Sequence, residues 1–308
     1  MSNVSNDYIE WIGIKEFNIL KDIRLEFSSQ INIIIGENGV GKTQILKLLY
    51  TEFNREKGQE VSNSFCNEFY NKGTQLELLK IVTGRESLFY GGTKLPCTYI
   101  PAKEILTHAN GFVPMYNKYK EFPFDKTYPT LIEKAQRWTL EEIPEIAKNI
   151  IPKLEKILNG TIVIQNNDFY VKKIDGTMVR FDTEAEGLKK IGLIWQLLMN
   201  ETITSGSALF WDEPEAFINP KFVPDLVEIL LELSRNGVQI FVTTHDYIFS
   251  KYFGVKSNDG EVLFHSLYKD DNNKVRYESD KTFSGLNHNS IRDTFIQLYE
   301  DEIERAME

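Results

Sequence analysis

Residues 31–43 read INIIIGENGVGKT, and they give the strongest indication of the class of fold. The first five residues, 31–35, form an apolar and largely β-branched run, which is typical of a buried parallel strand. Residues 36–43 then match the pattern GxxxxGK[ST] in full. Residues 44–50 place their apolar side chains at helical spacing. A strand, a glycine-rich loop and a helix in this order predict a phosphate-binding loop.

The predicted loop carries chemistry at each of its positions. Glycines let backbone N–H groups turn inward and cradle a β-phosphate, and the helix N-terminus adds its partial positive charge. Lys42 would reach the β- and γ-phosphates, while the Thr43 hydroxyl would bind Mg²⁺. A chance glycine-rich turn is the alternative, and the flanking strand and helix disfavour it. The predicted nucleotide-binding residues are Asn38, Gly39, Gly41, Lys42, Thr43 and Gln44.

A second apolar strand, 208–213 (ALFWDE), ends in two acids. Asp212 would hold Mg²⁺ through water, and Glu213 would polarise the water that attacks the γ-phosphate. Acids that follow a strand often cap the next helix, but the phosphate loop upstream makes this alternative weaker. We therefore predict Thr43 and Asp212 as metal ligands and Glu213 as a catalytic residue.

A third apolar strand ends in a histidine, within 241–246 (FVTTHD). His245 would hydrogen-bond the γ-phosphate or orient the attacking water. A lone histidine at a strand end is more often a polar surface residue. Its position about thirty residues after Glu213 favours the catalytic interpretation here.

Residues 183–187 (TEAEG) open the helix that precedes the paired acids. Thr183 and Glu186 fit a capping box, in which Thr183 caps the helix and Glu186 reaches back. That interpretation is complete without a function. The alternative is that this helix N-terminus points at a nucleotide held by a second protomer, and the capping box does not decide between the two.

The remaining sequence alternates apolar strands with helices, which predicts an α/β sandwich. Prolines limit 130–158 to short helices, and Asp175-Gly176 predicts a type I′ turn between strands at 169–174 and 177–181. The aromatic and basic stretch 116–128 is interpreted as buried aromatics or a protein-binding surface. Stacking on nucleic-acid bases is the less favoured alternative. Further strands are expected at 12–17, 23–27, 95–101, 238–243, 261–268 and 274–278, and further helices at 185–200, 220–235 and 289–305.

Composition excludes several classes of protein. The 308 residues are 42% hydrophobic and 12% aromatic, which excludes intrinsic disorder for most of the chain. A net charge of −10 argues against a surface coated in basic residues. Two cysteines are too few for a disulfide framework, and neither a secretory signal nor a membrane span is recognisable. We expect a cytoplasmic protein without a membrane partner.

The sequence resembles ABC ATPases, because it contains the phosphate loop, 212–215 (DEPE) and 244–245 (TH) in this order. More narrowly, they resemble AAA-type ATP-binding proteins related to the OLD-nuclease, RecF and SMC families, because 212–220 is similar to their DEPExxLxP pattern. The resemblance implies one ABC-type P-loop ATPase domain over 1–308. Its fold would be α/β, with a mostly parallel core sheet flanked by helices, an N-terminal antiparallel β portion, and a helical and β-hairpin insertion at 51–95 and 104–182.

The resemblance also implies roles by position. Lys42 and Thr43 match the Walker A residues, Asp212 the Walker B acid, Glu213 the catalytic glutamate and His245 the switch histidine. The signature motif, which would face a second protomer's nucleotide, falls on Ala185, Glu186 and Gly187.

Two family positions depart from the usual pattern. At the signature motif Ala185 and Glu186 replace the usual Ser and first Gly, and Lys189 and Lys190 are expected to offset the added acid. The Q-loop position lacks Gln, so that a Mg²⁺ role there would fall to Glu104.

The function that the resemblance implies is ATP hydrolysis with Mg²⁺ by a nucleotide-switched homodimer or higher oligomer. Its output would be the regulation of a separately encoded effector, a nuclease or toxin of a bacterial defence system. About 140 residues without heptads separate Thr43 from Thr183, which leaves no room for an SMC-type coiled coil. A RecF-like DNA-binding repair ATPase and an ATP-loaded scaffold with little turnover are the alternatives, and nucleic acid stays open as a partner.

Overall fold

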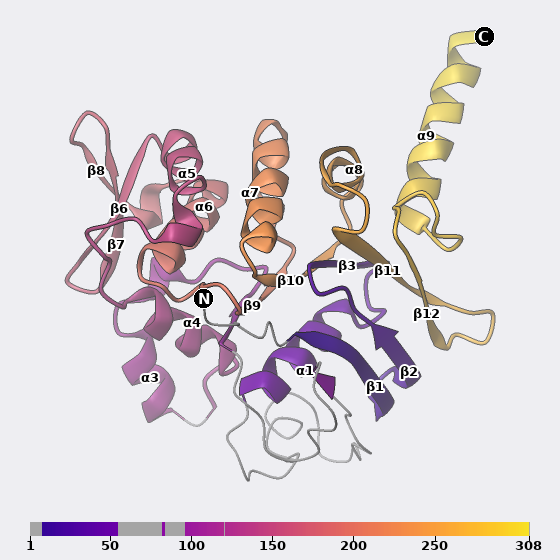
Figure 1. Ribbon diagram of the computed structural model, residues 1–308, viewed down its shortest axis with the longest axis horizontal. Helices are drawn as coiled ribbons and strands as arrows, with labels where there is room; N and C mark the ends of the chain where they lie inside the picture. Colours follow the sequence, from indigo (N-terminus) through magenta and orange to yellow (C-terminus); the bar gives the residue numbers. More distant parts are fainter. Residues whose placement is uncertain (1–7, 55–81, 84–95, 120, 308) are drawn as a thin grey trace, which may run out of the picture.

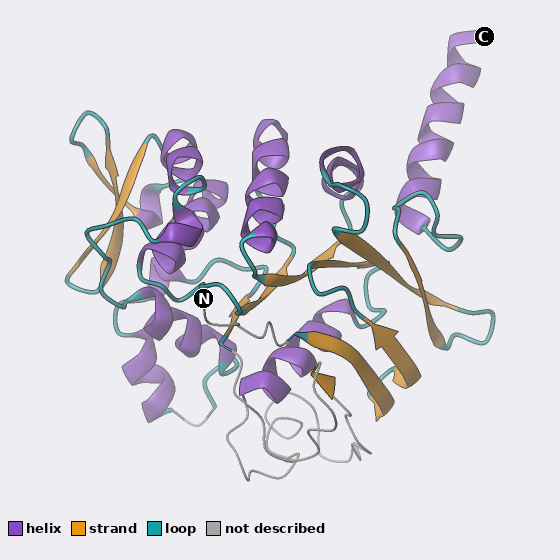
Figure 2. Ribbon diagram, in the orientation of Figure 1, coloured by secondary structure: helices purple, strands orange, loops and turns teal. Residues whose placement is uncertain are grey.

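The computed structural model describes residues 8–54, 82–83, 96–119 and 121–307. Six strands form the central sheet in the order β12-β11-β3-β10-β9-β5, and helices cover both of its faces (Figures 1 and 2). β3 pairs in parallel with β10 and β11, and β9 pairs in parallel with β10 and β5, whereas β12 is antiparallel to β11. The strands are β3 (Ile31–Gly36), β5 (Cys97–Ile100), β9 (Ala208–Asp212), β10 (Gln239–Thr244), β11 (Val262–Lys269) and β12 (Val275–Asp280). The predicted α/β fold with a mostly parallel sheet is confirmed.

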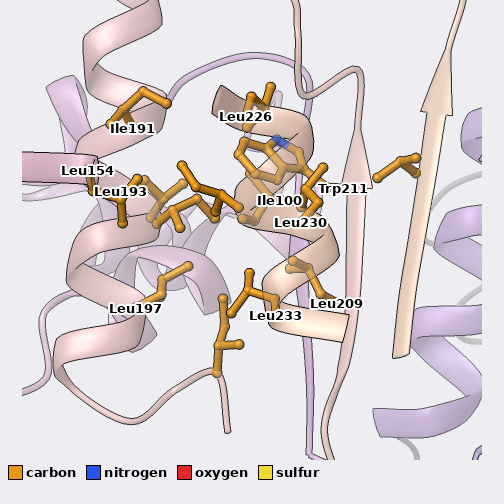
Figure 3. Packing of buried hydrophobic residues seen from close by; sticks show 14 of the residues in the cluster. Ile100, Leu154, Ile191, Leu193, Leu197, Leu209, Trp211, Leu226, Leu230 and Leu233 are labelled. Carbon is orange, nitrogen blue, oxygen red and sulfur yellow. The ribbon is translucent and has the colours of Figure 1, made fainter. Parts of the chain in front are cut away.

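Two apolar cores lie on the two faces of this sheet. Because side chains alternate along a strand, Ile33 and Ile35 pack into one core while Ile34 packs into the other. Leu209 and Trp211 pack against α6 (Glu186–Met199) and α7 (Val223–Arg235), as Figure 3 shows. Burial on both faces explains why the central strands are continuous apolar runs.

The second core is closed by α1 (Lys42–Asn54) and by a small antiparallel sheet. That sheet has the order β2-β1-β4, from β1 (Ile9–Phe17), β2 (Leu20–Glu26) and β4 (Val82–Thr83). Along β2, buried and exposed positions alternate from Ile23 to Glu26. The N-terminal antiparallel β portion is therefore confirmed.

A lobe of short helices and one small sheet lies at the β5 end of the central sheet (Figure 1). Its helices are α3 (Phe112–Lys118), α4 (Thr127–Ala135) and α5 (Ile151–Leu158), and its antiparallel strands are β6 (Gly160–Gln165), β7 (Asp168–Lys173) and β8 (Met178–Arg180). The sequence did not reveal β6. The assignment of 51–95 and 104–182 as one insertion stays a prediction, and 55–81 and 84–95 lie outside the described residues.

The predicted hairpin between β7 and β8 forms, but its turn is not of type I′. A type I′ turn needs positive φ at both central residues, and here Gly176 has φ +87° while Asp175 does not. The Asp175 carboxylate accepts the Thr177 amide at 2.9 Å. This bond lets Asp175 serve as a turn residue without adopting the left-handed conformation.

The aromatic stretch of the lobe is a packed cluster. Phe112 lies 5.2 Å from Phe122 and 5.1 Å from Phe124, and Tyr128 lies 5.1 Å from Phe124 between ring centroids. These rings pack against the core between the lobe and the central helices. The arrangement fits buried aromatics better than a stacking surface for bases.

The last two helices in sequence order complete the fold. α8 (Tyr247–Lys256) packs beside α7, and the sequence did not reveal it. α9 (Ser290–Met307) extends away from the body with no buried residue (Figure 1), so its acidic end is solvated as expected. In the described part of the chain, no helix has the length and hydropathy that a bilayer span requires.

Candidate active site

The predicted site residues gather where β3, β9 and β10 end. Parallel strands bring their carboxyl ends to one edge of a sheet, where ligands of open α/β folds usually bind. At this edge Gly36 has φ +144°, and a Cβ there would lie 2.2 Å from the Leu267 main-chain oxygen. Only glycine therefore lets the chain leave β3 and enter the loop that leads to α1.

Lys42 lies inside the loop that precedes it. Its ammonium donates to the main-chain oxygens of Gly36 at 2.7 Å and Glu37 at 2.9 Å, and its side chain is buried. Burial lowers the pKa of Lys42, whereas the carboxylates of Glu213 and Asp212 oppose this change. The loop therefore holds a cation beside two acids.

Thr43 and Asp212 are in direct contact. The Thr43 hydroxyl donates to Asp212 Oδ2 at 2.9 Å, and the Thr243 hydroxyl donates to the same carboxylate. Burial raises the pKa of Asp212, and these two hydroxyls oppose that change. A hydroxyl and a carboxylate are hard oxygen donors, and Mg²⁺ is usually held by one or two carboxylates together with substrate phosphates. The pair therefore fits Mg²⁺.

Glu213 and His245 form the second contact pair of the site. His245 Nδ1 lies 3.0 Å from Glu213 Oε1, and both side chains are partly exposed. β10 ends at Thr244, and Asp246 caps α8 by accepting the Phe249 amide at 2.6 Å. His245 is thus held between a strand end and a capped helix. A carboxylate fixed in this way can accept a proton from a water molecule.

Four further residues complete the site. The sequence assigned no role to three of them, and it gave Lys190 only the role of offsetting the acid at Glu186. The Lys190 ammonium donates to the Glu213 main-chain oxygen at 2.8 Å. The Thr244 hydroxyl donates to Glu215 Oε1 at 2.6 Å, and Thr243 binds Asp212. Glu215 and the two threonines stand within the quoted motifs DEPE and TTHD, so proximity to those motifs was the available signal.

The predicted capping box at 183–186 is wrong. α6 begins at Glu186, its N-cap is Ala185, and no side chain caps it. Thr183 instead ends a short 3₁₀ turn, Phe181–Thr183, and its hydroxyl donates to the Arg180 oxygen at 2.9 Å. Thr183 therefore lies two residues before the N-cap of α6, too far upstream to cap this helix.

The signature positions lie against another loop of the same chain. A Cβ on Gly187 would lie 2.6 Å from the Phe217 main-chain oxygen, so α6 approaches the 213–219 loop closely. Lys189 pairs with Glu186 at 2.7 Å, as expected for charge compensation, whereas Lys190 reaches Glu213 instead. The role of Ala185, Glu186 and Gly187 toward a second protomer's nucleotide stays a prediction.

Glu104 is engaged locally. Its carboxylate accepts the Thr107 amide at 3.2 Å and the Thr107 hydroxyl at 2.6 Å, at the start of a 3₁₀ turn, Leu106–His108. Burial raises the pKa of Glu104, and these bonds oppose the change. These contacts stabilise the start of the 3₁₀ turn, and they lend no support to a Mg²⁺ role for Glu104.

Gly187→Ala is expected to lower the free energy of unfolding by about 1–3 kcal/mol, because the new methyl group would overlap the Phe217 main chain. Gly254→Ala is the matched control, since a Cβ there meets nothing within 4 Å. In α8 this change should raise stability by about 0.5–1 kcal/mol. Chemical denaturation measures both. Equal effects would contradict the close approach of α6 to the 213–219 loop.

Glu215 should make stability depend on pH. Burial raises the pKa of Glu215 from 4.5 to about 7, so the folded state binds this proton more tightly than the unfolded state. Raising the pH from 4.5 to 7 should therefore lower the free energy of unfolding by up to about 3 kcal/mol, at about 1.4 kcal/mol per pH unit. Glu215→Gln should remove this slope in denaturation series at several pH values. The same slope in both proteins would contradict the assignment.

A known family matches residues 113–250 of the chain, and its description reads "AAA domain, putative AbiEii toxin, Type IV TA system". This range contains Asp212, Glu213 and His245. The DNA replication and repair protein RecF of Clostridioides difficile (strain 630) is 23% identical over 320 residues, covering 95% of this chain and 81% of RecF. The L-cystine import ATP-binding protein TcyC of Bacillus subtilis (strain 168) is 21% identical, covering 77% of this chain and 78% of TcyC.

Solved structures show the same fold. A Pyrococcus furiosus Smc head domain with an extended coiled coil, bound to the C-terminal domain of ScpA, has a TM-score of 0.52 at 11% identity, covering 96% of this chain and all of that one. Another Smc head, bound to the C-winged helix domain of ScpA, has a TM-score of 0.55 at 12% identity, covering 91% of this chain and all of that one. The predicted resemblance to AAA-type ATP-binding proteins, RecF and ABC ATP-binding proteins is confirmed, and the likeness to Smc heads shows a shared fold. The narrower relation to OLD nucleases stays a prediction.

Proposed function

We propose, from this relation to AAA-type ATP-binding proteins of the ABC and SMC group, that the chain is a Mg²⁺-dependent ATPase. The observation that carries the proposal is the meeting of two contact pairs at one sheet edge. Thr43 touches Asp212 at 2.9 Å, and Glu213 touches His245 at 3.0 Å, from segments far apart in the sequence. Both pairs lie at the sheet edge where the loop that holds Lys42 begins. Together they supply oxygen ligands for a metal and a base for water, which phosphoryl transfer to water requires.

Each residue has a part in the proposed hydrolysis. Lys42 and the loop amides bind the β- and γ-phosphates. Thr43 and Asp212 would hold Mg²⁺, which when bound neutralises charge on the phosphate oxygens. Glu213 accepts a proton from the water whose oxygen attacks the γ-phosphorus, while the bond to the ADP oxygen breaks. His245 orients the Glu213 carboxylate through the contact at 3.0 Å.

Phosphate release from ATP tests this proposal. The purified chain with Mg²⁺ should release phosphate continuously, and EDTA should stop the release, because the Thr43 and Asp212 oxygens would then have no cation to share with the phosphates. A chain that binds ATP with Mg²⁺ but releases no phosphate would contradict the proposal and would favour an ATP-loaded scaffold.

We also propose that ATP switches the chain into a homodimer or higher oligomer that regulates a separately encoded nuclease or toxin. Support comes from the matched family, whose description names a putative toxin of a type IV toxin–antitoxin system. The Smc heads of similar fold are bound to segments of ScpA. Helix α9 has no buried residue and could contact such a partner protein. A partner that is released or retained according to the bound nucleotide would support this role.

A RecF-like DNA-binding function is the second candidate, because the match to RecF extends over 95% of this chain. It requires a local basic groove in spite of the net charge of −10. Duplex DNA should then stimulate ATP hydrolysis, and the stimulation should fall steeply as salt rises. ATPase activity that is indifferent to DNA at low salt would exclude this candidate.

A further inference from the structure

We propose that Lys190 is a positioning residue that holds the Glu213 main chain in place for hydrolysis, an inference that rests on the ATPase function proposed above. Lys190 lies on α6, and its ammonium donates to the Glu213 main-chain oxygen at 2.8 Å. The side chain is 2% exposed, so solvent does not compete for this bond. Helix α6 thereby contacts the residue that would activate water.

The conformation of Glu213 explains why such a contact is needed. Glu213 has φ +47°, in the left-handed region that is unfavourable for a residue with a side chain. Its amide donates to the Thr243 main-chain oxygen at 3.1 Å, and its carbonyl accepts from Lys190. The residue is thus held on one side by β10 and on the other by α6. These two bonds fix the direction in which its side chain leaves the backbone, toward His245.

The charge of Lys190 points to the same role. Burial lowers the pKa of Lys190 to about 8, and the carboxylates of Glu215, Glu213 and Asp212 oppose this change. A buried ammonium is costly unless charge partners and hydrogen bonds compensate for its lost hydration. An apolar side chain of similar length would fill the same space without that cost. A lysine placed among the acids of the site therefore points to function more than to packing.

The backbone of α6 brings Lys190 to this position. Gly187, one turn earlier, permits the close approach to the Phe217 main chain, and residues three apart on a helix share a face. Lys189 is equally buried, but its ammonium pairs with Glu186 at 2.7 Å and does not contact Glu213. Lys189 belongs to the predicted signature motif through this pair, so the control is taken outside the site, at Lys153 of α5, whose ammonium pairs with Glu228 at 2.5 Å.

The test compares Lys190→Met, Lys190→Arg and Lys153→Met with the wild-type protein. Lys190→Met should lower kcat by about 10- to 100-fold, since a small misplacement of a catalytic group has an effect of this size, and it should change the Kd for a fluorescent ATP analogue by less than about 3-fold. Lys190→Arg should restore part of kcat, and Lys153→Met should stay within about 3-fold of wild type. Circular dichroism and thermal unfolding verify that each variant is folded.

A double variant separates positioning from a general effect on the site. In a Glu213→Gln background, Lys190→Met should cause no further loss in single-turnover hydrolysis, because both changes then act through one group. Independent losses that multiply would overturn the proposal. A crystal structure of Lys190→Met in which Glu213 keeps its left-handed φ and its His245 contact would also overturn it.

Failure of this inference differs from failure of the proposed function. If the wild-type protein hydrolyses ATP and Lys190→Met is equally fast, only the role of Lys190 is wrong. If the wild-type protein binds ATP but releases no phosphate, the ATPase proposal fails and the positioning role fails with it.

Discussion

Glu213→Gln is expected to reduce ATP hydrolysis by about a hundred- to ten-thousand-fold while ATP stays bound. The glutamine amide keeps the size of the side chain but cannot accept a proton from the attacking water. Nucleotide affinity should change little, because the binding groups lie on the loop at 36–43 and on Asp212. Phosphate release and titration with a fluorescent ATP analogue measure the two effects separately.

Glu228→Gln is the matched control for the loss of one carboxylate. Glu228 lies on α7 and pairs with Lys153 at 2.5 Å and Lys256 at 3.3 Å, on helices outside the site. Its hydrolysis rate should stay at the wild-type level. If Glu213→Gln also hydrolyses ATP at the wild-type rate, Glu213 is not the residue that activates water.

Lys42→Ala is expected to weaken ATP binding by about 10- to 150-fold, because hydrogen bonds to a charged group contribute about 1.5–3 kcal/mol. The change also removes the cation that faces Asp212 and Glu213, so less positive charge remains to bind the phosphates. Hydrolysis at fixed ATP should fall with binding. Calorimetric titration of ATP with Mg²⁺ measures the affinity directly.

Lys251→Ala, at an exposed position on α8, controls for the loss of one positive charge. Its affinity for ATP should equal that of the wild-type protein. Equal weakening by both substitutions would mean that general electrostatic attraction, and not the loop at 36–43, accounts for the binding. The expected result is a large difference between the two.

The sequence predicts the main parts of the site because each motif combines a strand with the residue that follows it. Once β3, β9 and β10 are parallel neighbours, their carboxyl ends must meet, so Thr43, Asp212, Glu213 and His245 converge. Burial on both faces makes the central strands continuous apolar runs, and these runs identify them in the sequence. These inferences need only local patterns and one rule of sheet geometry.

The contact of Lys190 with Glu213 could not be predicted in this way. It depends on how closely α6 approaches the 213–219 loop, and that distance is set by tertiary packing at Gly187 and Phe217. The capping box is wrong because the 3₁₀ turn at Phe181–Thr183 delays the start of α6 to Glu186, which leaves Ala185 and not Thr183 at the N-cap. Motif spacing contains no information about either feature.

The proposed nucleotide switch requires that ATP binding at this site change the oligomeric state of the chain. Light scattering measures the solution mass of the wild-type protein and of Glu213→Gln, each with and without Mg²⁺-ATP. ATP is expected to double the mass, transiently for the wild-type protein and lastingly for Glu213→Gln, because the variant binds ATP without hydrolysing it. An identical mass with and without nucleotide in both proteins would contradict the nucleotide switch.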